Sequence, residues 1–370
     1  MIQRTFIASL LIFAASMASA ESLTPVDVFT AGQDGYFAYR IPALVTTKQG
    51  TLLAFCEGRK TSLSDDGDND LVLRRSSDGG ATWKPLQLVH DEGGNAIITI
   101  GNPCPVVDQS NGRIWLPMNR KNGRVLITYS DDDGVTWSPV RDITSQASKP
   151  EWGWYALGPG VGIQLELGPR RGRLVIPANH RTTKDRSGPS ASHIIYSDDH
   201  GATWHVGGIV GLHTNECQVV ETPAQIGGEL LINMRNHWGR SGGKPELAGR
   251  RLISRSTDDG MKWSEAVRDE GLIEPTCQAS LIRYSWSASD SKSILVFANP
   301  GSTSKREKTT VRLSYDEGRT WPESKLVDGG SSGYCCLTRL ADGRIGLIYE
   351  RDSYKKLSFV AFTPQWVREP

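Results

Sequence analysis

The chain has 370 residues, with 42 basic and 41 acidic side chains and a formal net charge of +1 at pH 7. A neutral chain without basic runs is a poor candidate for a nucleic-acid-binding protein, so we expect no nucleic-acid partner. Its start is typical of a targeting segment: Arg4 is followed by the apolar stretch Phe6–Met17, which is too short to span a bilayer, and by Ala18–Ala20, which fits signal-peptidase cleavage. We therefore predict a signal peptide at residues 1–20, one domain over residues 21–370, no membrane span, and export to the periplasm or the exterior.

An eight-residue signature, Ser-x-Asp-x-Gly-x-Thr-Trp, recurs along the chain. Its five copies begin at Ser76, Ser130, Ser197, Ser256 and Ser314, and only the fourth departs, with Lys262 in place of Thr. Such self-similarity at a nearly constant period indicates a repeat architecture. Each copy predicts a hairpin turn, because Asp and Ser bond nearby backbone, Gly adopts a positive φ, and Trp packs on the core. We therefore interpret the signature Asp residues as structural rather than catalytic.

Short apolar strands surround each signature. One strand leads into it, another follows its Trp, and two more come before these. First strands open at Arg40, Asn102, Gly160, Glu216, Thr276 and Tyr334; second strands end near Glu57, Asn119, Asn179, Arg235, Asn299 and Glu350. Strands rich in Val, Ile and Leu between Gly and Asp turns, with no sustained helical periodicity, predict an all-β fold. Six such units predict a six-bladed β-propeller of four-stranded antiparallel blades.

The two ends of the chain predict how the ring closes. The sixth unit reaches a third strand near its end and then stops, without a fourth. Residues 24–32 resemble the fourth strands of the other units and precede the first complete unit. We therefore predict that this N-terminal strand closes the last blade and removes the open edges.

Six cysteines in an exported chain could form disulfides. Cys217, Cys277 and Cys335, however, fall at the same place in successive repeats, and we interpret them as packed thiols. For the other three cysteines the sequence leaves both states open: Cys56, Cys104 and Cys336.

No pattern in the sequence predicts a metal or a cofactor. The seven histidines lack metal-ligand spacing. Asp66, Asp68 and Asp70 alternate as in a calcium loop, but Leu71 and Ser77 stand where an EF-hand needs Gly and Glu.

In a four-stranded meander, the start of the first strand and the loop between the second and third strands lie at one edge. The signature turns lie at the opposite edge. Charged residues and one tyrosine should therefore gather at the mouth of the central channel: Arg40, Arg59, Asp65, Glu216, Arg235, Arg306, Tyr334 and Glu350.

At these residues the chain resembles the sialidases, a family of secreted or lysosomal exo-α-neuraminidases, and the resemblance covers nearly all of residues 21–370. It rests on these motifs in order: YRIP at 39–42, EGR at 57–59, SDDGDNDLVLRRS at 64–76, NECQVVE at 215–221, LLINMRN at 230–236, TVRLSYDEGRTW at 310–321 and GYCCLTRLADGRIGLIYE at 333–350.

The resemblance implies that Arg40, Arg235 and Arg306 bind the carboxylate of sialic acid, which suits planar guanidinium groups. Glu350 would steady Arg40, and Arg59 would face the sugar near its C4 hydroxyl. Apart from the resemblance, His213 and His237 lie near Glu216 and Arg235 in sequence, so we expect them at the rim of the pocket as structural contacts rather than catalysts.

The resemblance also implies three catalytic roles. Tyr334 would be the nucleophile, as in the sialidase exception among glycosidases, since a neutral phenol avoids repulsion by the substrate carboxylate. Glu216 would accept the phenolic proton, and Asp65 would act as acid and base, with Asp66 as the alternative acid.

The implied activity is a retaining exo-α-sialidase acting on sialylated glycoproteins, glycolipids or oligosaccharides, and we expect a monomer. A trans-sialidase or intramolecular trans-sialidase would use the same residues, so the sequence leaves these alternatives open. A noncatalytic glycan-binding propeller would be expected to lack at least one of Asp65, Glu216 and Tyr334, and all three are present.

Overall fold

The computed structural model describes residues 23–94, 96–223, 229–287 and 292–369, so the predicted signal peptide lies outside the described residues. Within that part the chain forms 25 strands and four short helices. The helices are α1 (Thr144–Ala147), α2 (Trp238–Ser241), the 3-10 helix η1 (Pro245–Leu247) and α3 (Pro364–Arg368). None of these helices is long and apolar enough to cross a membrane.

The strands pair antiparallel in sheets that follow one another along the chain. The first sheet is β2 (Ala38–Thr46), β3 (Leu52–Arg59), β4 (Asn69–Ser76) and β5 (Gln87–His90). The second is β6 (Ile100–Gly101), β7 (Val106–Val107), β8 (Ile114–Arg120), β9 (Arg124–Ser130) and β10 (Arg141–Asp142). The third is β11 (Tyr155–Leu157), β12 (Ile163–Gln164), β13 (Leu174–Arg181), β14 (Ser190–Ser197) and β15 (His205–Leu212).

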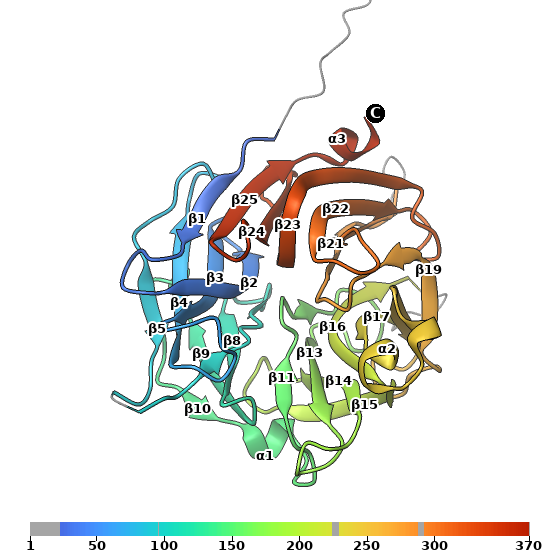
Figure 1. The fold of residues 1–370 in the computed structure, drawn as a ribbon, viewed down its shortest axis with the longest axis horizontal. Coiled ribbons are helices and arrows are strands. Elements are labelled where there is room, and N and C mark those ends of the chain that lie inside the picture. Colours follow the sequence, from blue (N-terminus) through green and yellow to red (C-terminus); the bar gives the residue numbers. More distant parts are fainter. Residues whose placement is uncertain (1–22, 95, 224–228, 288–291, 370) are drawn as a thin grey trace, which may run out of the picture.

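The fourth sheet is β16 (Thr214–Thr222), β17 (Glu229–Asn236), β18 (Arg250–Ser256) and β19 (Val267–Ile273). The fifth has seven strands: β20 (Ser280–Ser285), β21 (Ile294–Pro300), β22 (Glu307–Ser314), β23 (Glu323–Arg339), β24 (Ile345–Arg351), β25 (Lys356–Phe362) and β1 (Val26–Thr30). The sheets surround a common centre, so the fold is all-β and propeller-like (Figure 1).

The number of sheets differs from the predicted six separate four-stranded blades, because strand pairing gives five sheets. The difference arises at β23, which runs without interruption for 17 residues. Its first half pairs with β22, from Glu323 to Ser331, and its second half pairs with β24, from Ser332 onward. One continuous strand therefore joins two repeat units that the sequence pattern separates.

The N-terminal strand lies where the sequence predicts it. β1 pairs antiparallel with β25, the last strand of the chain. Asp27 of β1 contacts the ammonium of Lys356 at 2.6 Å and accepts a hydrogen bond from Ser358 at 2.6 Å. The start and the end of the chain thus share one sheet, and the edge of that sheet is covered.

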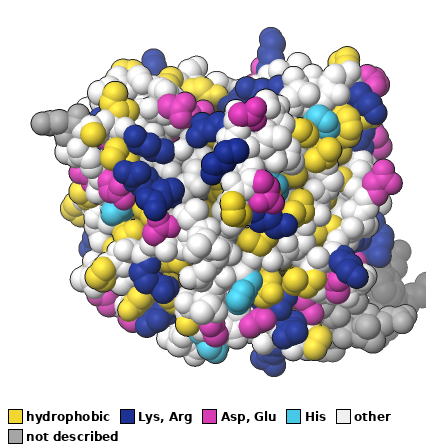
Figure 2. All heavy atoms as spheres, turned by 90° about the horizontal axis from the view of Figure 1, so that it is seen from below, with side chains coloured by type: hydrophobic (Ala, Val, Ile, Leu, Met, Phe, Trp, Pro, Cys, Tyr) yellow, Lys and Arg dark blue, Asp and Glu magenta, His cyan; other side chains and the backbone are white. Residues whose placement is uncertain are grey.

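Seen from the side of the molecule that carries α1, basic and acidic side chains are interspersed over the surface (Figure 2). This distribution agrees with the formal net charge of +1. On a surface of mixed charge, a local excess of one sign produces a distinct electrostatic potential.

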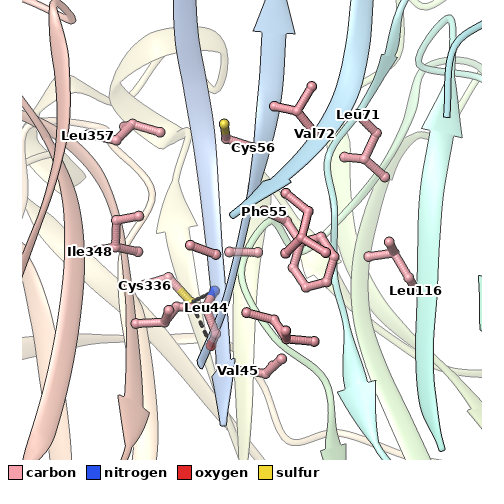
Figure 3. Close-up of a cluster of buried hydrophobic side chains, with 14 of the residues drawn as sticks. Leu44, Val45, Phe55, Cys56, Leu71, Val72, Leu116, Cys336, Ile348 and Leu357 are labelled. Atoms are coloured by element: carbon pink, nitrogen blue, oxygen red, sulfur yellow. Dashed lines mark hydrogen bonds between the residues drawn. The ribbon is translucent and has the colours of Figure 1, made fainter. Parts of the chain in front are cut away.

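The core fills the spaces between neighbouring sheets. Figure 3 shows side chains from the first, second and last sheets packed together, among them Phe55, Leu116 and Ile348. Cys336 belongs to this cluster, and its sulfur accepts a hydrogen bond from the backbone N–H of Leu44 at 3.2 Å. All six cysteines are buried free thiols, which confirms the prediction for Cys217, Cys277 and Cys335 and answers the open question for the other three.

The signature turns are held by their own polar side chains. In the first copy, Ser76 donates to Asp78 at 2.7 Å and accepts from the N–H of Gly80 at 2.9 Å. Hydrogen bonds from the hydroxyl and the N–H of Thr82 lower the pKa of Asp78 to about 2. Gly80 has a φ of +92°, and a Cβ there would lie 2.0 Å from the ring of Phe359. The structural interpretation of the signature is confirmed by these bonds.

Phe29 tests how much the N-terminal strand contributes to stability. Its side chain is 1% exposed and its ring lies 5.1 Å from that of Tyr39 in β2, so it packs β1 against the first sheet. We expect Phe29→Ala to lower the free energy of unfolding by about 3 kcal/mol or more, through lost burial and a cavity. Urea denaturation would measure the change.

Val26 provides the matched control, because it lies on the same strand but is only half-buried. Val26→Ala should cost less than about 1.5 kcal/mol. Equal losses in the two variants would contradict a specific anchoring role for Phe29.

Candidate active site

The predicted site residues gather at one edge of the sheets, on the side opposite the signature turns. Pairing places the start of each first strand beside the end of the second; Arg40, for example, lies opposite Glu57. Arg40, Glu216 and Tyr334 come from first strands, and Arg59, Arg235 and Glu350 come from the ends of second strands. Asp65 and Arg306 lie on the β3–β4 and β21–β22 loops. Asp65 is the exposed member, with 73% of its side chain accessible.

Tyr334 contacts both Glu216 and Arg235. Its hydroxyl donates to Oε1 of Glu216, and Nη1 of Arg235 donates to the hydroxyl at 3.0 Å and to Oε2 of Glu216 at 2.6 Å. Three residues that are 19 to 118 positions apart in sequence thus form one buried triangle. A phenol and a carboxylate in direct contact can exchange a proton.

Burial raises the pKa of the Tyr334 hydroxyl well above its ordinary value. The charge of Glu216 raises it further, while the charges of Arg235 and Arg306 oppose the rise. The phenol therefore stays protonated at neutral pH and can react as a nucleophile only if a neighbouring base takes its proton. Glu216 occupies the position of such a base.

Glu350 is fully buried and binds three partners. Its oxygens accept from Nε and Nη2 of Arg40 at 3.0 and 3.1 Å. They also accept from the backbone N–H groups of Ile41 at 3.0 Å and of Tyr334 at 2.8 Å. Burial disfavours the charge of Arg40, but Glu350 outweighs this effect and the pKa of Arg40 is raised. One carboxylate therefore fixes both an arginine and the backbone of the candidate nucleophile.

Arg59 links the loop of Asp65 to the body of the site. Its Nη2 donates to Oε2 of Glu57 at 2.7 Å and to Oδ1 of Asp65 at 2.8 Å. The same Asp65 oxygen lies 3.7 Å from Nη1 of Arg40. Asp65, rather than Asp66, is thus the carboxylate that contacts two of the candidate arginines.

Arg306 completes the set of cations around the phenol. Its guanidinium carbon lies 5.5 Å from the centre of the Tyr334 ring, and that of Arg40 lies 5.2 Å away. Together with Arg235 at the hydroxyl, three arginines surround one phenol. Such a group of guanidinium donors can bind a carboxylate held beside the ring.

Tyr354 is a site residue that the sequence reasoning missed. Its hydroxyl accepts from Nη1 of Arg306 at 3.2 Å, and the guanidinium carbon of Arg40 lies 4.4 Å from its ring centre. It sits in the β24–β25 turn with a φ of +68°, after Asp352 and Ser353, which also have positive φ. Its position in the sequence could have identified Tyr354, because this turn joins a second strand to a third strand and so lies at the same edge as the other site residues.

The two rim histidines differ in their surroundings. His237 is buried, and burial together with the charges of Arg235 and Arg240 lowers its pKa to about 2. His213 is partly exposed and packs on Trp238, with ring centres 4.2 Å apart. Neither contacts the hydroxyl of Tyr334 within the described residues, so the proton transfer considered above does not involve them.

A cluster of carboxylates lies beside the Asp65 loop, where Asp68, Asp70 and Asp91 approach one another. The ammonium of Lys60 lies within 3.0 to 3.5 Å of an oxygen of each. Lys60 therefore already supplies the positive charge that a bound cation would supply.

Comparison with known proteins shows what the chain is similar to. A model of the BNR repeat-like domain matches residues 50–347. The chain is 35% identical to a sialidase of Micromonospora viridifaciens over 88% of its length. It is 34% identical to a sialidase of Bacteroides fragilis, again over 88%. Its fold superimposes on a solved Hadza microbial sialidase with a TM-score of 0.82 and 32% identity, covering 93% of this chain and 69% of that one.

The chain belongs to the sialidase family. It spans about half of the Micromonospora sialidase, 52% of its length, and 62% of the Bacteroides sialidase. What the comparisons establish is therefore family membership for the shared propeller region.

Glu350→Gln tests whether the buried carboxylate holds the site together. The substitution keeps the shape but removes the charge that balances Arg40, which is 8% exposed. We expect the free energy of unfolding to fall by about 3 kcal/mol, the scale for leaving a buried charge without its partner.

Glu270→Gln is the control, because Glu270 pairs with Arg250 and Arg268 but is 69% exposed. That change should stay within about 0.5 kcal/mol. Urea denaturation of both variants gives the comparison, and a Glu350→Gln protein as stable as the wild type would refute the assigned role.

Proposed function

We propose that this protein is an exo-α-sialidase that removes terminal sialic acids from glycoproteins, glycolipids or oligosaccharides with retention of configuration. The observation that carries the proposal is the contact of the buried Tyr334 hydroxyl with Glu216 and Arg235. Sialidases are an exception among glycosidases because their nucleophile is a tyrosine, and a phenol held between a carboxylate and a guanidinium is consistent with that role.

The arginines account for recognition of the sugar. Sialic acid carries a carboxylate on its anomeric carbon, and Arg40, Arg235 and Arg306 converge on the phenol beside which that carbon must lie. Charge-assisted hydrogen bonds from these groups would fix the carboxylate and so orient the anomeric carbon toward the tyrosine oxygen. Arg59, which contacts Asp65, would face the sugar near its C4 hydroxyl.

The first step forms a covalent bond. The oxygen of Tyr334 attacks the anomeric carbon while Glu216 takes the phenolic proton, and the bond from that carbon to the glycosidic oxygen breaks. Asp65 gives its proton to the departing oxygen. The neutral phenol is suited to this attack because it approaches a carbon that already bears an anionic group.

The second step releases the sugar. Asp65, now ionised, takes a proton from a water that attacks the anomeric carbon, and the bond to the Tyr334 oxygen breaks. Glu216 returns its proton to the phenolate. Two displacements on the same carbon restore the original configuration, and the free enzyme is regenerated without a cofactor.

We also propose that the functional architecture is a six-bladed propeller. The support is the pairing of β23, whose two halves belong to different sets of four strands: β20 to β23, and β23 to β25 with β1. Counting β23 in both sets gives six units, each contributing its first-strand start to the same edge. We further propose that the protein is exported, on the basis of the targeting segment at residues 1–20.

Tyr334→Phe tests the nucleophile. The substitution removes only the oxygen that forms the covalent bond, so turnover of a fluorogenic sialoside should fall on the order of 10³-fold or more. Tyr284→Phe is the matched control, since its hydroxyl donates to the carbonyl of Gly343 away from the site. Full activity in Tyr334→Phe would eliminate the proposed mechanism, and product analysis would separate free sialic acid from a transferred or anhydro sugar.

Asp65→Asn tests the acid. The lactose of sialyllactose is a poor leaving group and needs a proton to depart, so we expect its hydrolysis to fall about 10²-fold or more. The umbelliferone of an umbelliferyl sialoside is an activated phenol that departs without a proton, so hydrolysis of that substrate should fall less. Asp66→Asn provides the control, because Asp65 is the neighbour that contacts Arg59 and Arg40. The assignment fails if Asp66→Asn shows the larger loss on sialyllactose.

A further inference from the structure

A cavity that shares no residue with the candidate active site lies between the second and third sheets. Its volume is about 710 Å³, within the range of small-molecule sites. Its walls come from the β8–β9 turn, from α1 with the segment that follows it, and from the β13–β14 loop. No role in the proposed reaction involves these segments.

The walls of this cavity carry an excess of positive charge. The lining residues include four cations, Arg124, Lys149, Lys184 and Arg186, against one carboxylate, Asp142, which gives a local charge of +3 in a chain of formal charge +1. Asp142 pairs with Arg124 at 2.8 Å. Figure 2 looks onto the side of the molecule that carries α1, where Lys and Arg side chains lie among acidic and uncharged ones.

Three of these cations lack a carboxylate partner. Within the described residues, no carboxylate oxygen lies within 4.0 Å of the charged nitrogens of Lys149, Lys184 or Arg186. Asp185 lies between two of them in sequence, but its oxygens accept hydrogen bonds from Thr183 and Ser187. Lys149 also lies 5.6 Å from the ring of Trp152, which lines the same cavity. The cavity thus offers exposed cations, while the Trp152 ring itself is 5% exposed and stacked on His180.

Hydrogen bonds connect this cavity to the candidate active site. Glu57, the partner of Arg59, accepts from the N–H of Asn102 at 3.0 Å. Asn102 donates to the side chain of Asn122 at 2.8 Å, and the next residue, Gly123, lines the cavity. Both the β8–β9 turn and the β13–β14 loop join second to third strands, so they lie on the same face as Asp65. A glycan seated in the active site would extend over this face.

We propose that this cavity is a second binding site for the carboxylates of acidic sugars, which lets the protein hold glycans that carry more than one of them. This inference rests on the proposed function, because it takes the first acidic sugar to be held at Tyr334. Ammonium and guanidinium groups without carboxylate partners favour an anion, and a concave site of this volume can enclose a sugar. Attraction of this kind adds affinity for the extended substrate without touching the reacting bond.

The test compares an extended acidic glycan with a short one. The extended probe is a linear oligomer of five α2,8-linked sialic acids, which presents carboxylates at successive distances from its end; the short probe is 3′-sialyllactose. Binding is measured by calorimetry at low ionic strength on Tyr334→Phe, so that neither probe is consumed. Adding Lys184→Ala and Arg186→Ala should weaken binding of the oligomer about fivefold, the scale of two exposed ion pairs, and leave sialyllactose unchanged.

The control removes the same charge elsewhere. Lys84→Ala with Lys262→Ala takes two exposed cations from the opposite face, one just after the first signature turn and one within the fourth, and should leave both dissociation constants unchanged. Added salt should reduce the difference seen with the oligomer. The proposal is overturned if the control weakens the oligomer equally, or if the cavity variant binds it as well as its parent does. Failure of the proposed function would appear separately, as absence of sialoside hydrolysis by the wild type.

Discussion

The contact of Glu350 with Arg40 and with the backbone of Ile41 and Tyr334 is the constraint on which the site depends. Glu350 and Tyr334 belong to the last sheet and Arg40 to the first, so the carboxylate joins two sheets that lie at opposite ends of the chain. A fully buried carboxylate is costly to desolvate unless all its partners are in place. Its burial therefore requires that the ring be closed, and the same closure brings the phenol beside an arginine. Ring closure and the geometry of the site therefore depend on the same contact.

Ring closure also explains the position of the N-terminal strand. β1 fills the edge of the last sheet, and Phe29 packs against Tyr39, the residue just before Arg40. The backbone that presents Arg40 is thus supported from outside by the strand that closes the ring. A loss of packing at Phe29 would loosen the junction between the first and last sheets, and Glu350 is buried at that junction. Stability and geometry of the site are coupled through this junction.

Much of this arrangement could be predicted from the sequence, since each repeat marks the same turn and the same two edges. The repeat placed Arg40, Glu216 and Tyr334 on one face because the pattern predicts all three at the starts of first strands. It could not predict that β23 would continue unbroken between two units, since a strand's ends depend on which neighbours pair with it. It also missed Tyr354, whose position depends on a turn of consecutive positive φ values rather than on any repeated motif. Local patterns predict the edges of the sheets and the repeated turns, whereas long-range pairing determines where individual strands end.

The three arginines around the phenol differ in how their charges are balanced, and this difference has a consequence for binding. Arg40 is paired with Glu350 and Arg235 with Glu216. For Arg306, no carboxylate oxygen of the described residues lies within 4.0 Å, and its side chain donates to the hydroxyl of Tyr354. Two cations are therefore largely committed to holding the site, whereas the third keeps an unbalanced charge beside the phenol. Under the proposed function, an anionic sugar would gain most from the cation that has no competing carboxylate, so Arg306 would contribute most to attraction and the other two arginines to orientation.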